Sequence, residues 1–154
     1  MREHMGLFRG KRLDNGEWIE GSLVISRIEI PTKSFDSYRI QQTTCGLDED
    51  GFADYMSGYD EEVDPDTVGE CTGLTDKNGK LIFEGDIVEG HCHSAWSHRL
   101  QRCAVAYSRD GFEARNYISG LDSEYYTYRV RFSRDVVVIG TVHDNPELLK
   151  GGEE

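Results

Sequence analysis

The stretch TGLTDKNGKLIFEGDIV, residues 72–88, decides the fold of this chain. It contains Asp76-Lys77-Asn78-Gly79, and Asn and Gly accept the positive φ of tight hairpin turns while Asp hydrogen-bonds nearby amides. Glu84-Gly85-Asp86 then separates two short apolar runs, so we expect the backbone to turn a corner at Gly85. This pattern is typical of a small, closed β structure. We interpret the stretch as a folding corner rather than a binding loop.

Upstream, the turn sequence Asp14-Asn15-Gly16-Glu17 lies between β-favouring segments over residues 7–13 and 18–25. This arrangement predicts an antiparallel hairpin. Residues 28–30 extend the same sheet until Pro31 stops regular pairing, because proline has no backbone N–H to donate.

A short strand is expected over residues 38–43, and a strongly acidic segment over 48–66 follows it. Its aromatic residues are Phe52, Tyr55 and Tyr59. We interpret the segment as a solvated connection held down by these aromatics, rather than as an acidic partner-binding or DNA-mimicking loop.

Downstream, β character over residues 67–72 leads into the central stretch. Residues 103–108 and 112–117 bracket Arg109-Asp110-Gly111, which predicts a second hairpin. Residues 126–132 alternate between apolar and polar, as expected of a strand with one buried face.

The last strand is expected over residues 136–142, a nearly continuous β-branched run that suits a strand covered on both sides. Residues 145–151 read Asn-Pro-Glu-Leu-Leu-Lys-Gly, which predicts one short C-terminal helical turn with Asn as its cap. The sequence therefore predicts a single all-β domain of small, barrel-like architecture over residues 1–154. We expect two packed β subdomains within it, a hairpin and sheet unit over 1–66 and an SH3-like barrel over 67–154.

Composition limits the classes of partner. The 154 residues carry a formal net charge of -12, which disfavours a general surface for nucleic acid. No apolar run approaches the roughly 20 residues of a membrane span, and no signal-peptide core follows the first residues, so we expect a cytoplasmic protein. In that compartment its four cysteines are expected to be reduced thiols rather than a disulfide framework.

Metal-capable side chains cluster in one segment. They are His91, Cys92, His93, His98 and Cys103. Zinc accepts imidazole and thiolate ligands, yet no C-x-x-C pair anchors the cluster and its spacing is not that of a standard zinc finger. A polar hairpin loop with a buried cysteine is therefore favoured over a zinc site.

The same segment combines Trp96 with Arg99 and Arg102, and aromatic and basic residues together can bind single-stranded nucleic acid. Acidic neighbours are expected to pair with these arginines, so a role in covering a strand face is favoured. The sequence has no G-x-S-x-G elbow, phosphate-binding glycine loop, H-E-x-x-H or dinucleotide fingerprint. We therefore predict no catalytic residues and no cofactor.

The central stretch resembles the signature of the YopX family, proteins encoded by bacteriophages and prophages. Further matching segments are Phe8-Arg9-Gly10-Lys11, Asn15-Gly16-Glu17-Trp18, residues 64–69 and residues 139–149. The resemblance thus covers most of the chain in order. It implies no catalytic residues, because the family has no established biochemical activity. Members vary most between the central signature and the closing segment, which here holds the histidine- and cysteine-rich cluster.

These observations predict a non-enzymatic interaction module that binds a protein of the phage or its bacterial host. The residues expected to bind that partner are Trp96, His98, Arg99 and Arg102. The acidic run Asp60-Glu61-Glu62 is a second candidate surface, and exposed β edges favour a homo-oligomer. The alternative hypothesis is a nucleic-acid-binding or zinc-binding phage accessory factor.

Overall fold

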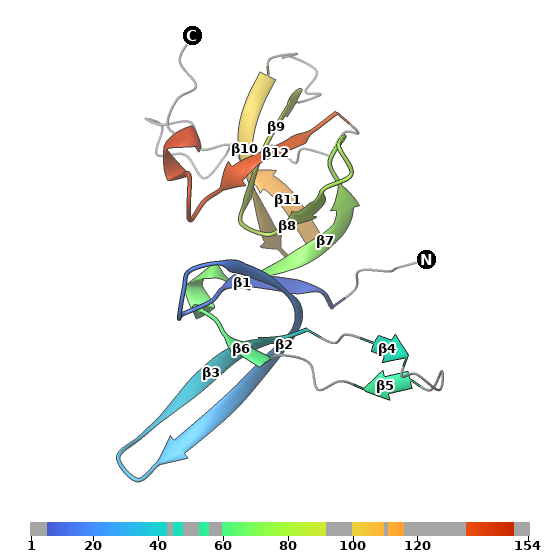
Figure 1. Ribbon diagram of the computed structural model, residues 1–154. Coiled ribbons are helices and arrows are strands. Elements are labelled where there is room, and N and C mark those ends of the chain that lie inside the picture. Colours follow the sequence, from blue (N-terminus) through green and yellow to red (C-terminus); the bar gives the residue numbers. More distant parts are fainter. Residues whose placement is uncertain are drawn as a thin grey trace. The chain divides into compact units, whose positions relative to one another are not determined.

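The computed structural model describes residues 6–42, 45–47, 53–55, 60–91, 100–109, 111–115 and 135–149. These residues form an all-β structure with antiparallel strand pairing, which confirms the expected fold class (Figure 1). The chain divides into two compact units, an N-terminal unit of His4–Glu70 and a C-terminal unit that comprises Cys71–Glu154.

The strands are β1 (Phe8–Lys11), β2 (Trp18–Ile30), β3 (Lys33–Gln41), β4 (Cys45–Leu47), β5 (Ala53–Tyr55), β6 (Asp60–Glu62), β7 (Gly69–Thr75), β8 (Leu81–Phe83), β9 (Asp86–His91), β10 (Leu100–Ser108), β11 (Gly111–Arg115) and β12 (Val137–Thr141). Two 3-10 helices accompany them, η1 (Pro65–Thr67) and η2 (Pro146–Leu149). No helix among the described residues is long and apolar enough to cross a membrane.

Hydrogen bonding orders the strands as β6-β3-β2-β1-β7-β8 in a six-stranded sheet and as β11-β10-β9-β12 in a four-stranded sheet, with β4 and β5 forming a separate pair. The described strands do not close into a barrel. The strand expected over residues 126–132 lies outside the described residues. The SH3-like barrel therefore stays a prediction.

The first expected hairpin is confirmed. Lys11 of β1 lies opposite Trp18 of β2, and Gly16 in the turn has a φ of 72°. The Arg12 N–H donates to the Glu17 carbonyl at 2.9 Å and closes the loop. The turn chemistry thus set both the position and the register of this hairpin.

Regular pairing of β2 stops before Pro31, as expected, but the sequence did not predict that the chain reverses there. β2 runs to Ile30, and pairing resumes at once with Lys33 opposite Ile30, so Pro31 and Thr32 form a two-residue turn. The missing N–H of proline is harmless inside a turn, where its fixed φ is favoured. β3 consequently begins at Lys33 rather than near Tyr38.

The acidic connection is more regular than expected. It contains β5 and β6, and Asp60–Glu62 of β6 pairs with Arg39–Gln41 of β3. Thr67, expected to begin a strand, belongs instead to η1, where the Asp64 side chain accepts the Asp66 N–H at 3.0 Å. An aspartate cap and Pro65 at the first helical position favour a helical turn there.

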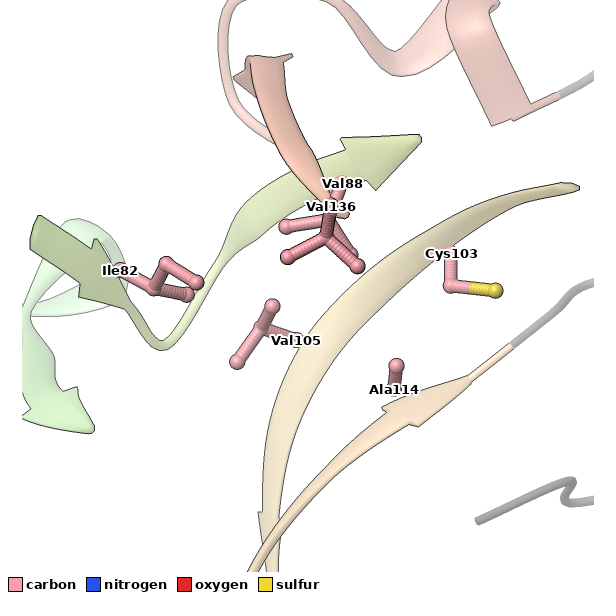
Figure 2. Close-up of a cluster of buried hydrophobic side chains, with 6 residues drawn as sticks. All are labelled: Ile82, Val88, Cys103, Val105, Ala114 and Val136. Atoms are coloured by element: carbon pink, nitrogen blue, oxygen red, sulfur yellow. The ribbon is translucent and has the colours of Figure 1, made fainter. Parts of the chain in front are cut away.

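Each unit has its own apolar core. In the N-terminal unit, Ile19, Ile40 and Val63 are buried, and Phe8, Leu23, Tyr38 and Val68 pack against them. In the C-terminal unit, the core residues are Ile82, Val88, Cys103, Val105, Ala114 and Val136 (Figure 2). Figure 2 shows these side chains gathered from β8, β9, β10 and β11, with Val136 contributed from the position just before β12.

The second expected hairpin is also confirmed, with Ser108 of β10 opposite Gly111 of β11. β12 differs from expectation because its side chains are only partly buried and it lies at the edge of the four-stranded sheet. The C-terminal helical turn is present as η2. The Asn145 side chain, expected to cap it, accepts the Thr141 N–H at 3.4 Å.

Candidate functional site

Asp76 in the central stretch connects the turn before β8 to β12. One carboxylate oxygen, Oδ1, accepts the backbone N–H groups of Asn78 at 2.8 Å and of Lys80 at 3.0 Å. The other, Oδ2, accepts the N–H of Val138 at 3.1 Å. The carboxylate is buried and fully occupied with main-chain donors, so its role is to fix the turn against β12.

The ionisation of Asp76 follows from these contacts. Burial alone would raise the pKa of its carboxyl group, but the N–H donors of Val138, Lys80 and Asn78 and the charge of Lys80 outweigh burial and lower it. Asp76 is therefore a carboxylate in the folded chain at neutral pH. A carboxylate held in this way is a poor general acid or base, because its proton affinity is low.

The corner at Gly85 is built by similar means. Gly85 has a φ of 82°, its N–H donates to Val105 at 2.8 Å, and its carbonyl accepts the Val142 N–H at 2.9 Å. Asp86 is completely buried and its Oδ2 accepts the Phe83 N–H at 2.8 Å. These contacts support the interpretation of residues 72–88 as a folding corner, since their polar groups hold the backbone of this unit together.

A different surface lies at the outer end of the β9–β10 hairpin. Leu100 lies opposite His91 at the last described pair of the two strands, and its side chain is 56% exposed. Leu100 and Arg102 share one face of β10, because successive side chains of a strand alternate. An apolar side chain and a cation are thus presented together, directly after residues 92–99 in the sequence.

Arg102 pairs with Glu89, its cross-strand neighbour on β9. Its Nε donates to the Glu89 Oε2 at 2.9 Å, and both side chains remain partly exposed. Such an exposed pair contributes only about 0.2–1 kcal/mol to stability. Its main effect is to orient the guanidinium and offset its charge.

The residues predicted to bind a metal or a partner fall into two groups. Cys92, His93, Trp96, His98 and Arg99 lie outside the described residues, and for His91 only the backbone at the end of β9 is described. Arg102 is exposed, as a binding residue requires, whereas Cys103 is 2% exposed and packs in the core with Val88. The structure therefore separates these two neighbours onto opposite faces of β10.

No group of three or more histidine, cysteine, aspartate or glutamate side chains capable of holding a metal occurs in the part of the chain that the structure describes. The other metal-capable residues named from the sequence lie outside the described residues, or have only their backbone described, so the zinc hypothesis stays a prediction.

Sequence reasoning missed a second exposed surface, on the outer half of β2 and β3. Ile25, Ile28, Ile30 and Phe35 are between 38% and 55% exposed there. The sequence did contain a signal for this surface: apolar residues occupy both odd and even positions of the segment, and therefore both faces of the strand, with Arg27 and Glu29 among them. A strand with apolar side chains on both faces is usually buried on both faces.

Comparison with solved structures finds a similar chain in the crystal structure of protein EF1440 from Enterococcus faecalis. The two chains are 25% identical, the match covers 92% of this chain and 96% of that one, and the TM-score is 0.45. No curated protein gave a match. The family model described as YopX protein matches residues 7–150, nearly the whole chain. The chain therefore belongs to the YopX family.

Proposed function

We propose that this protein is a non-enzymatic binding module that recognises another protein, of phage or bacterial host origin, at the outer end of the β9–β10 hairpin. The observation that carries the proposal is the joint presentation of Leu100 and Arg102 on one face of β10. An exposed leucine next to an oriented arginine is a combination suited to a protein interface, where an apolar centre is bordered by polar groups.

The distribution of charge favours a protein partner over nucleic acid. Arg102 is paired with Glu89, Arg39 with Asp60 at 3.1 Å, and Arg12 with Asp14 and with Glu61. Each of these cations already has a carboxylate neighbour in a chain of net charge -12. Phosphate binding would require those neighbours to be displaced, which lowers its free-energy gain.

The buried aspartates of the central stretch bind backbone N–H groups, which favours a non-enzymatic role. Asp76 and Asp86 are buried and accept backbone N–H groups, so neither is placed to act on a substrate. We further propose that the C-terminal unit is SH3-like and that the protein acts in the cytoplasm. The antiparallel sheet β11-β10-β9-β12, bent away from β8 at Gly85, supports the first of these proposals.

The test begins with capture of partners from a nuclease-treated lysate of the bacterial host, using the full chain as bait. Leu100→Ser with Arg102→Ala forms the altered bait, and Leu13→Ser is the matched control because Leu13 is 59% exposed in the other unit. We expect to capture a protein that the native chain and the control retain and that the altered bait loses.

Equal retention by all three baits would place the binding surface elsewhere. Nucleic acid captured from an untreated lysate, with no protein retained after nuclease treatment, would favour the alternative of a nucleic-acid-binding accessory factor. Metal retained with the purified chain would favour a zinc-binding one.

A further inference from the structure

The outer half of the β2–β3 hairpin is a two-stranded ribbon. The two strands pair from Ser22 opposite Gln41 out to Ile30 opposite Lys33. Among the described residues, β1 pairs with β2 only at 18–21, and β6 pairs with β3 only at 39–41. Figure 1 shows the two strands running on together beyond β1 and β6 to their connecting turn. The described neighbours therefore leave the long edge of β2 beyond Gly21 open.

Apolar side chains line both faces of this ribbon. Ile28 lies opposite Phe35, and Ile25 lies opposite Tyr38 on the other face. Ile25 is 55% exposed and Phe35 is 44% exposed. A two-stranded ribbon is marginal in water by itself, and an open edge with apolar side chains is a template for a further strand.

The charges on β2 are arranged symmetrically about Ile28. Arg27 and Glu29 flank it, point to the opposite face, and form a long ion pair within the chain, with Nε and Oε1 3.9 Å apart. They still expose 66% and 79% of their side chains, so both charges remain accessible to a second chain. If two β2 edges lie antiparallel about a two-fold axis at Ile28, Arg27 of each copy lies opposite Glu29 of the partner subunit. A two-fold axis at Arg27 would instead place two arginines opposite each other, and one at Glu29 would place two glutamates. Opposite charges in directly facing positions stabilise a strand pair and like charges destabilise it.

We propose that the β2 edge from Ser26 to Ile30 pairs antiparallel with the same edge of a second copy of this chain, with the two-fold axis at Ile28. The occupant is a second copy because the sequence Arg27-Ile28-Glu29 is complementary to itself in this register. The paired edges form a four-stranded intermolecular sheet from two ribbons. Its residues belong to the N-terminal unit, so this inference is independent of the partner surface proposed on β9 and β10.

The experiment is sedimentation velocity of the full chain over a range of concentrations, with charge variants at the edge. Glu29→Arg creates facing arginines and Arg27→Glu creates facing glutamates, so each is expected to raise the dimer dissociation constant at least tenfold. The double variant Arg27→Glu with Glu29→Arg restores facing opposite charges and is expected to return the constant to within about threefold of the native value. Mixing the two single variants is expected to restore dimers, because each chain then complements the other.

Glu147→Arg is the control, since it makes the same charge change on an exposed residue of η2 and is expected to leave the constant unchanged. Circular dichroism of each variant checks that the fold is retained. A native chain that stays monomeric at all concentrations would overturn the proposal. It would also be overturned by single variants that dimerise as tightly as the native chain, or by a double variant or mixture that fails to recover dimers.

Discussion

The Oδ2 atom of Asp76 accepts the backbone N–H of Val138, 62 residues further along the chain, at 3.1 Å. This bond joins the turn of the central stretch to β12, the edge strand of the four-stranded sheet. We predict that Asp76→Asn lowers the free energy of unfolding by about 2–3 kcal/mol, because an amide cannot accept at both oxygen positions and buried N–H groups lose their partner. Urea denaturation measures the change. Asp66→Asn, at an exposed residue, is the control and is expected to change stability by less than about 0.5 kcal/mol. Equal effects of the two substitutions would contradict the role assigned to Asp76.

Stability should depend on the ionisation of Asp76. Its pKa is lower in the folded chain than the ordinary value, so the unfolded chain binds the proton more readily than the folded chain. The stabilisation is therefore fully present above the unfolded pKa of about 3.9 and is lost as the pH falls through the folded pKa. The expected result is a stability difference between the native chain and Asp76→Asn that narrows below about pH 4. A difference that stays constant from pH 6 to pH 3 would show that the charge of Asp76 does not contribute.

Gly21 on β2 lies where β2 has neighbours on both sides. A Cβ placed on it would collide with the backbone carbonyl of Gln41 and approach the side chain of Ile40 at 2.9 Å. Backbone cannot move aside as a flexible side chain can, so we predict that Gly21→Ala destabilises the protein by about 1–3 kcal/mol. Thermal unfolding measures the loss, with Ser22→Ala at the next, exposed position as the control. An unchanged melting temperature for Gly21→Ala would show that the two strands lie further apart than described.

Substitutions of Cys103 can show whether this residue is part of the core or a metal ligand. Because its side chain is buried among Val88 and the other core residues, we predict that Cys103→Ser lowers the free energy of unfolding by about 1–3 kcal/mol, the cost of burying a hydroxyl group. Cys103→Ala keeps an apolar side chain and is expected to cost less. Chemical denaturation and elemental analysis of the same preparations test this. Stoichiometric zinc in the native chain that both variants lose would contradict the assignment to the core.

The parts of the fold that were predictable depend on short-range chemistry. Asp14–Glu17 and Arg109–Gly111 carry turn residues whose backbone preferences are local, so both hairpins were placed correctly from the sequence. Pro31 ends β2 as expected, but the tight turn that it forms with Thr32 was not predicted, so the start of β3 was placed too late. The start of β3 is determined by that turn, and β6 is determined by its pairing with β3, which is distant in the sequence. Neither boundary could be predicted from local sequence.

The candidate site was less predictable because it depends on which strands meet. The sequence singled out Arg102 but could not show that Glu89 orients it, since that pairing is set by the register of β9 and β10. Leu100 was missed because one apolar residue at the start of a strand is an ordinary feature of a sequence. Its exposure depends on which residues form the core of the C-terminal unit, and the sequence alone does not specify them.

The central claim is that the outer end of the β9–β10 hairpin binds a protein partner while residues 72–88 maintain the fold. Isothermal titration calorimetry with the purified captured protein tests it most directly, comparing the native chain, Leu100→Ser, Arg102→Ala and Leu13→Ser. Truncating a central apolar contact costs about 1–2 kcal/mol or more, so we predict that Leu100→Ser and Arg102→Ala each raise the dissociation constant about tenfold or more, while Leu13→Ser leaves it unchanged. Equal dissociation constants for all four chains would contradict the claim.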